Sequence, residues 1–272
     1  MEKKYYFLSG MPRSGNTVLS AILNQNPNIY SSPLSPVCQY LFFLDNYSKN
    51  HEGMKRSSDH AGSNNIMKNI LNNHYSHINK PIIFDREKYW GTETNLALIK
   101  KYLNSSPKII FTVRPILEIL TSFITINKNN YIENAMKNDG WQYNDKISLN
   151  DNICDYLMLT NSDLHQSAMI IKEYHKIENK GVYHLVEYDN LISSPNKTMS
   201  GIYSFLGIES HIHDFNKILK LEIDDDDKVG MPKDMHEVRP VLQKISQKPE
   251  DVLSKYVIDR YQGLDFWKEE ND

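Results

Sequence analysis

Residues 10–17 read Gly-Met-Pro-Arg-Ser-Gly-Asn-Thr, which is almost the pattern of a phosphate-binding loop. That pattern, Walker A, is Gly, four residues, Gly, Lys and then Ser or Thr. The spacing agrees throughout, but Asn16 stands at the lysine position and the basic residue Arg13 comes three places earlier. The Walker lysine reaches the β- and γ-phosphates of a nucleoside triphosphate. Its absence therefore favours a ligand that places a single phosphate at this loop.

Charged residues follow three apolar runs that have the composition of buried strands. Residues 81–84 lead to Asp85, residues 108–113 lead to Arg114, and residues 181–186 lead to Glu187. A fourth run, residues 5–8, leads into the phosphate-binding loop. In parallel α/β sheets, ligands bind outside the carboxyl ends of the strands. We therefore expect these terminal residues to lie near one site.

The elements that position these residues alternate between strands and helices. Apolar residues recur at helical spacing over residues 18–23, 93–103 and 116–126, and in one long helical pattern from about residue 150 to 178. This alternation predicts a three-layer α/β fold with a mainly parallel central sheet, similar to P-loop NTPases. We expect one domain over residues 1–272. Regions 46–79 and 131–149 fit the pattern less well, and we interpret both as insertions near the site that bind an acceptor.

Composition limits the classes of partner. The net charge is −3 with 40% hydrophobic residues, so a nucleic-acid partner is not expected and an anion site must be a local basic cluster. Two distant cysteines and no long apolar stretch predict a cytoplasmic chain without a membrane span. No metal is expected. His74 and His77 lack a third ligand, His211 and His213 have the same weakness, and the acidic run 224–227 is interpreted as solvated loop charge.

Three segments in the same order resemble the sulfotransferases. Residues 7–19, FLSGMPRSGNTVL, are similar to the 5′-phosphosulfate-binding loop of that family, with Asn16 in place of its usual Thr or Ser. Residues 111–123, FTVRPILEILTSF, are similar to its 3′-phosphate motif, in which a Ser follows eight residues after an Arg. Here Pro115 directly follows Arg114, where the family more often has Asp or Asn first. Residues 185–207 resemble a third, architectural segment of the family.

The resemblance implies an enzyme that uses 3′-phosphoadenosine 5′-phosphosulfate without a metal and releases adenosine 3′,5′-bisphosphate. The sulfuryl group would pass by in-line displacement to a hydroxyl or amine of a small-molecule or peptide acceptor. Arg13 would stabilise charge on the bridging oxygen, and Arg114 and Ser122 would select the 3′-phosphate. The cofactor-binding residues that the resemblance implies are Pro12, Arg13, Ser14, Gly15, Asn16, Thr17, Arg114, Ser122, Lys233 and Arg239.

The general base is the open question at this level. Asp85 closes a predicted strand and is our candidate base, with Arg86 as a second charge stabiliser. The same Asp85 could instead cap the next turn or pair with Arg86. Two other functions stay open. A small-molecule kinase would need ATP and magnesium, which the missing Walker lysine disfavours, and a catalytically silent nucleotide-binding protein would share the fold.

Overall fold

The computed structural model describes residues 2–57, 60–127, 129–159, 162–219, 231–232, 235–244 and 247–268. Its centre is a five-stranded sheet in the order β2-β3-β1-β4-β5, in which every neighbouring pair is parallel. The strands are β1 (Lys4–Gly10), β2 (Ile29–Leu34), β3 (Ile82–Arg86), β4 (Ile109–Val113) and β5 (Tyr183–Glu187). The predicted α/β class with a parallel sheet is confirmed.

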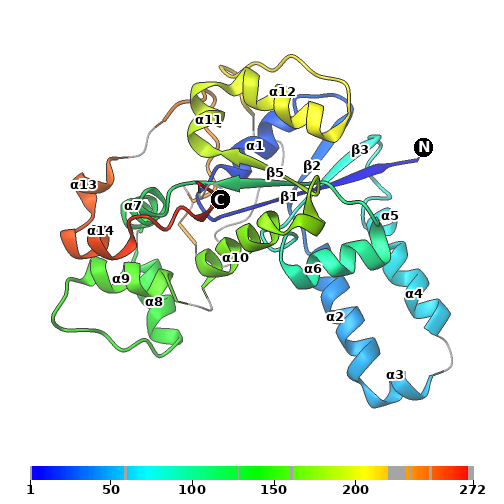
Figure 1. The fold of residues 1–272 in the computed structure, drawn as a ribbon, viewed down its shortest axis with the longest axis horizontal. Coiled ribbons are helices and arrows are strands. Elements are labelled where there is room, and N and C mark those ends of the chain that lie inside the picture. Colours follow the sequence, from blue (N-terminus) through cyan, green and yellow to red (C-terminus); the bar gives the residue numbers. More distant parts are fainter. Residues whose placement is uncertain are drawn as a thin grey trace.

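Helices connect the strands and cover both faces of the sheet (Figure 1). The α-helices between β1 and β4 are α1 (Asn16–Leu23), α2 (Val37–Asn50), α3 (Glu52–Arg56), α4 (His60–Lys68), α5 (Ile70–His74) and α6 (Glu93–Leu98), which continues into the π-helix η1 (Ile99–Leu103). Those that follow are α7 (Ile116–Ile126), α8 (Tyr131–Asn138), α9 (Leu149–Leu157), α10 (Asp163–His175), α11 (Tyr188–Ser193), α12 (Pro195–Leu206), α13 (Pro249–Val252) and α14 (Lys255–Tyr261). Short 3₁₀ helices are η2 (Ile177–Asn179) and η4 (Phe266–Lys268).

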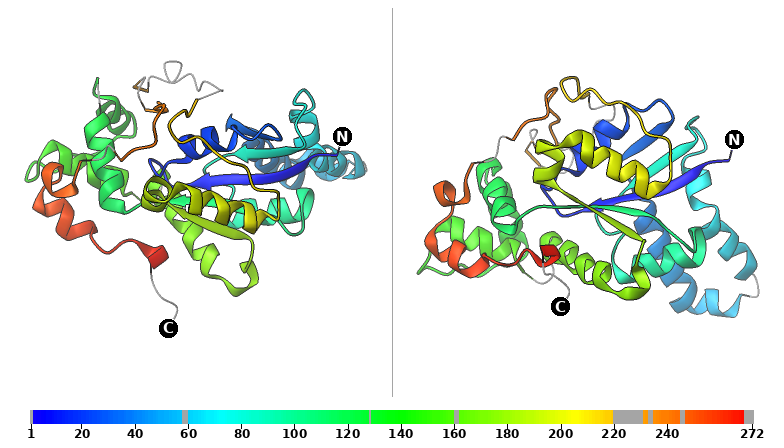
Figure 2. Two further views of the ribbon diagram at one scale, coloured as in Figure 1. Left: turned by 90° about the horizontal axis from the view of Figure 1, so that it is seen from above. Right: turned by 45° about the horizontal axis from the view of Figure 1, so that its top comes forward.

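Alternating strand residues divide the core into two layers. Tyr6 and Leu8 of β1 pack with Ile110 of β4 against α1, α11 and α12. Phe7 and Phe111 pack on the opposite face against α2, α6, α7 and α10. Figures 1 and 2 show these two sets of helices on either side of the sheet. Since successive side chains of a strand point to opposite faces, this division also fixes where the residues at the strand ends point.

Two differences from the sequence expectations concern single elements. β2 was not expected, because Ser31, Ser32 and Pro33 give it no apolar run. The long helical pattern at 150–178 is two helices, α9 and α10, and Ser162 begins the second by accepting a hydrogen bond from the backbone of His165 at 3.1 Å. This break brings the start of α10 to the carboxyl edge of the sheet.

The two regions interpreted as insertions occupy different places. Residues 46–79 include α3, α4 and α5, which with α2 form an arm that extends from the sheet at the lower right of Figure 1. Residues 131–149 contain α8 and the start of α9, which lie beside α7 on the opposite side of the molecule in the same view. The second region therefore lies at the carboxyl end of β4, which precedes α7.

Candidate active site

The loop between β1 and α1 has a backbone shape that depends on its glycines. A Cβ at Gly10 would lie 2.1 Å from Oγ1 of Thr112, so no other residue fits there. Gly15 has a φ of 94°, and Arg13 adopts a left-handed φ of 61°. A left-handed non-glycine residue is strained by about 1–2 kcal/mol and is found at functional sites. The loop thus turns sharply and directs the first N–H groups of α1 toward its own concave side.

Ser14 holds this loop to the sheet. Its Oγ donates to the carbonyl of Met11 at 2.5 Å and lies 2.5 Å from Oγ1 of Thr112 in β4. The Ser14 side chain is 1% exposed. Asn16 adds a bond of 3.3 Å from Nδ2 to the same Met11 carbonyl, and its Oδ1 is buried without a partner among the described residues. Ser14 therefore supports the loop from behind.

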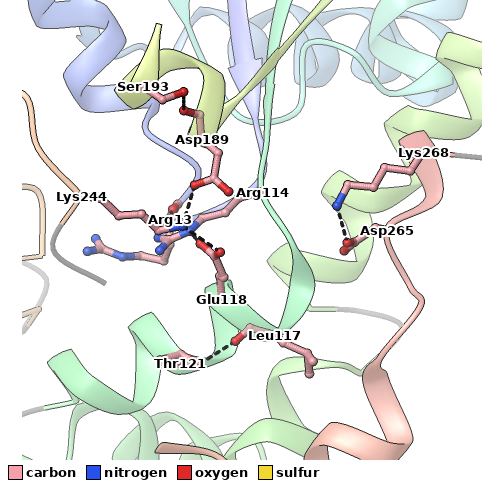
Figure 3. A network of polar contacts seen from close by, with 10 residues as sticks. All are labelled: Arg13, Arg114, Leu117, Glu118, Thr121, Asp189, Ser193, Lys244, Asp265 and Lys268. Carbon is pink, nitrogen blue, oxygen red and sulfur yellow. Dashed lines mark hydrogen bonds and ion pairs between the residues drawn. The ribbon is translucent and has the colours of Figure 1, made fainter. Parts of the chain in front are cut away.

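Arg13 and Arg114 approach each other above the loop (Figure 3). Nη1 of Arg114 donates to the carbonyl of Arg13 at 2.9 Å, and its guanidinium stacks 4.3 Å from the ring centre of Tyr188. Nε of Arg13 donates to Oγ of Ser122 at 3.1 Å, and its Nη1 donates to the carbonyl of Met235. Arg13, Arg114 and Ser122, which the sequence placed at two separate phosphate positions, form one connected cluster.

Arg114 carries a donor that the described residues leave unused. The side chain is buried, its Nε donates to Oε2 of Glu118 at 3.1 Å, and its Nη2 has no hydrogen-bond partner within the described ranges. An unpaired buried charged donor costs more than the 1–3 kcal/mol of a neutral one. A phosphate oxygen would satisfy it in the planar geometry that guanidinium groups favour. The donor set here therefore fits an anionic group.

Lys244 is a basic residue of this cluster that the sequence reasoning missed. Its Nζ lies 3.1 Å from Oε1 of Glu118 and 2.7 Å from Oδ1 of Asp189, which joins α7 to α11 (Figure 3). The expected basic residues of this segment were Lys233, which lies outside the described residues, and Arg239, which is exposed and lines the cavity described below. No sequence spacing distinguished Lys244 from other surface lysines.

Arg86 and Asp85 are neighbours in β3 but point to opposite faces. Nη1 of Arg86 donates to Oγ1 of Thr17 in α1 at 3.0 Å, and its Nε donates to the carbonyl of Ser32 at 3.3 Å. Arg86 therefore lies beside the phosphate-binding loop, on the same face as Phe84. This position agrees with the expected contact of Arg86 with the transferred group.

Asp85 is enclosed on the other face and is 0% exposed. Its carboxylate accepts three hydrogen bonds of 2.7 Å, from Oγ of Ser35, the hydroxyl of Tyr75 and Nε1 of Trp90. Burial raises the pKa of Asp85, against the effect of these donors. A base must reach the proton that it removes. The geometry therefore does not support Asp85 as the general base and gives it a structural role.

One cavity of about 810 Å³ runs along the carboxyl edge of the sheet. Its lining brings together nine expected site residues: Pro12, Arg13, Gly15, Asn16, Thr17, Arg86, Arg114, Ser122 and Arg239. Ser14 and Asp85 do not line it. Region 131–149 contributes Tyr131, Ile132, Ala135 and Asp139, whereas no described residue of region 46–79 contributes. The basic cluster occupies the loop end of this cavity.

Lys88, Tyr89 and Asp163 form a second polar group that the sequence reasoning missed. Nζ of Lys88 lies 2.5 Å from Oδ2 of Asp163, and the Tyr89 hydroxyl donates to Oδ1. Lys88 and Asp163 both line the cavity. A signal was present in the sequence, because Ser162 followed by Asp163 is typical of a helix start and not of a helix interior.

Two absences concern only the part of the chain that the structure describes. There, no cluster of three or more His, Cys, Asp or Glu side chains is placed to hold a metal ion. Nor does any helix in the same ranges combine the length and apolar character needed to cross a membrane. The acidic run 224–227 lies outside the described residues.

The sequence and the fold both match known sulfotransferases. The family of the sulfotransferase domain matches residues 3–248, so the chain belongs to the sulfotransferase family. A solved structure of the sulfotransferase domain from the curacin biosynthetic pathway is similar, with a TM-score of 0.52 and 14% identity over 97% of this chain and 92% of that one. The sulfotransferase domain of the Synechococcus PCC 7002 olefin synthase gives 0.52 and 17% over 96% and 88%. No curated protein matches the chain.

Membership in this family confirms the resemblance seen in the three sequence segments. It places the chain among transferases and does not favour the kinase alternative. At 14% and 17% identity, the two structural relatives support the fold alone.

Proposed function

We propose that this protein transfers a sulfuryl group from 3′-phosphoadenosine 5′-phosphosulfate to a hydroxyl or amine of an acceptor. The observation that carries the proposal is the convergence of Arg13, Arg86 and Arg114 on one loop, with Nη2 of Arg114 buried and unpaired. Family membership supports it. Two phosphate-bearing positions on one nucleotide match a basic cluster that extends from α1 to α7.

Each basic residue has a separate task in this proposal. The donor supplies an activated sulfuryl group whose sulfur–oxygen bond to the 5′-phosphate breaks during transfer. Arg13 and Arg86 offset the negative charge that develops on that phosphate. Removal of one preorganised donor of this kind typically costs about 2.7–4 kcal/mol of transition-state stabilisation. The loop residues Pro12, Gly15, Asn16 and Thr17 enclose the 5′-phosphate, and Ser14 keeps the loop in shape.

Arg114 distinguishes this donor from ATP in our proposal. Its free Nη2 points to a phosphate position separate from the loop, and Ser122 adds a hydroxyl two turns into α7. Lys244 balances the charge of Glu118, so Arg114 keeps its net positive potential. Arg239 lies on the cavity wall and completes the basic surface, while Lys233 stays an expectation from the sequence.

Calorimetric titration with adenosine 3′,5′-bisphosphate tests the donor site. We expect binding that does not need magnesium, and Arg114→Ala should weaken it about 10- to 100-fold, because hydrogen bonds to charged groups contribute about 1.5–3 kcal/mol. Arg114→Lys should recover only part of this affinity, since lysine lacks the planar fork. Arg56→Ala is the matched control, because Arg56 is exposed on α3 and pairs only with Glu52 in the contacts that surround it.

Titration with ATP and magnesium in parallel decides between the alternatives. A clear preference for ATP with magnesium would contradict the proposal and favour a kinase. Failure of the wild-type protein to bind either nucleotide would favour a catalytically silent member of the fold.

A further inference from the structure

The end of the cavity away from the phosphate-binding loop has an apolar wall. Side chains from α7, α8, α9 and the segment after α9 form it: Phe123, Ile126, Ile132, Ala135, Leu157 and Leu159. Ile132 belongs to a small core with Met136 and Ile153, against which Phe123 and Leu157 also pack. This core fixes the wall in place. A preformed apolar wall binds the apolar body of a ligand and gives little to a fully hydrated one.

Lys88, Tyr89 and Asp163 stand between this wall and the loop. The backbone carbonyl of Lys88 accepts a hydrogen bond of 2.6 Å from Oγ of Ser9, at the point where β1 enters the loop. Asp163 comes from the first turn of α10, and the ion pair between Lys88 and Asp163 joins the two elements at 2.5 Å. The group is therefore fixed next to the donor loop on one side and next to the apolar wall on the other.

Asp163 retains the capacity to accept a further proton. A carboxylate has about four lone-pair positions, and Lys88 and Tyr89 occupy one on each oxygen. The Asp163 side chain is 55% exposed, so an acceptor that enters the cavity can reach it. Burial and the hydrogen bond to Asp163 raise the pKa of Tyr89, which keeps its phenol a donor.

We propose that the acceptor is an alcohol or phenol with an apolar body, bound against the wall of α7, α8 and α9, and that Asp163 is the general base. This inference rests on the proposed sulfuryl transfer. It follows from the juxtaposition of an apolar wall, an accessible carboxylate and the donor loop in a single cavity.

The proton and electron balance of the step is complete with these groups. The acceptor oxygen forms a bond to sulfur while its proton passes to Asp163. The bond between sulfur and the bridging oxygen breaks, and its electron pair stays on the 5′-phosphate beside Arg13 and Arg86. Lys88 holds Asp163 in position and stabilises its ionised form. Asp163 then returns the proton to solvent, so no oxidant, reductant or metal is needed.

The other carboxylate of the cavity has a different position. Asp139 accepts a hydrogen bond of 2.6 Å from the Tyr156 hydroxyl, at the end of α8. It has no contact with the segment that follows β3 in the hydrogen bonds and ion pairs of the described residues. Asp139 is therefore a matched comparison: a second carboxylate in the same cavity that lacks the link to the donor loop.

The test uses the full chain, labelled 3′-phosphoadenosine 5′-phosphosulfate and three probes: 2-naphthol, 1-octanol and glucose. We expect transfer to the two apolar alcohols and not to glucose. Asp163→Asn should lower kcat for 2-naphthol by at least about 100-fold, the usual contribution of a general base, while bisphosphate affinity changes less than about twofold. Asp163→Glu should recover part of the rate.

A fourth probe separates a base from a structural residue. 4-Nitrophenol is largely ionised at mildly alkaline pH and needs no base, so Asp163→Asn should affect its sulfation far less than that of 2-naphthol. Asp139→Asn should change the KM of both phenols alike, without such a dependence on acidity.

Each failure has a distinct meaning. Bisphosphate binding without transfer to either apolar alcohol overturns this inference and leaves the donor site intact. Equal loss with both phenols, or no loss with either, overturns the role of Asp163. Absence of bisphosphate binding by the wild-type protein overturns the proposed function itself, and this inference with it.

Discussion

Single residues in β3 show how a one-position shift separates structure from chemistry. Asp85 and Arg86 are adjacent, and the sequence expectation placed both at the site. The two-residue period of a strand sends their side chains to opposite faces, so Arg86 reaches Thr17 and Asp85 reaches Tyr75. The period could be read from the sequence. Which face carries the phosphate-binding loop could not, because that depends on how α1 packs.

Asp85 should therefore matter for stability. Asp85→Ala leaves the buried donors of Ser35, Tyr75 and Trp90 without their acceptor, and each orphaned donor costs about 1–3 kcal/mol. We expect the free energy of unfolding to fall by about 3–5 kcal/mol. Urea unfolding at neutral pH measures this loss. Protein that stays folded should bind adenosine 3′,5′-bisphosphate normally, and loss of binding at full stability would return Asp85 to the site.

At the scale of elements, the unit β1–loop–α1 is where sequence and structure agree best. The Gly-rich pattern after an apolar run predicted a strand, a turn and a helix, and all three are present. The unit works because Gly10 lets the loop pass close to β4. A hypothetical Cβ at Gly10 would also lie 2.6 Å from Nδ2 of Asn16, so the same glycine sets the position of a residue that lines the cavity.

Gly10→Ala should thus damage the loop more than it damages the fold. The clash with Thr112 and Asn16 must move the loop, and we expect bisphosphate affinity to fall at least about tenfold, which corresponds to 1.4 kcal/mol. Calorimetry gives the affinity and thermal unfolding gives the stability. Gly201→Ala in α12 is the control, because the nearest atom is 3.6 Å away and alanine favours a helix by about 1 kcal/mol. Equal affinities in both variants would refute this account of the loop.

At the scale of the whole molecule, the sequence predicted the strands that carry the loop and the arginines, but not the cavity. The apolar runs of β1, β3, β4 and β5 stand out because a central parallel strand is buried on both faces. Asp163, Lys88 and Lys244 gave no comparable signal, because their roles arise from contacts between segments more than 50 residues apart. Such contacts depend on how the helices close over the sheet, which local patterns do not specify.

Burial at the edge of the sheet also makes the stability of the whole molecule depend on pH. Glu87, next to Arg86, is 1% exposed, and burial raises its pKa from 4.5 to about 7, against the opposing effects of Lys88 and a hydrogen bond with Gln39. Between these pH values the folded protein holds a proton that the unfolded chain has lost. Stability therefore falls as pH rises through this window, by an amount on the order of 3 kcal/mol.

Replacement of Glu87 by Gln isolates this effect. Glu87→Gln has no charge to bury, so its free energy of unfolding should exceed that of the wild-type protein by roughly 1–3 kcal/mol at about pH 8 and match it near pH 5. His213, whose pKa burial lowers to about 4, gives both proteins the opposite trend, which cancels in the difference between them. Urea unfolding of both proteins at the two pH values measures that difference. A difference that stays constant with pH would show that Glu87 is ionised in the folded protein throughout, with Lys88 offsetting the cost of its burial.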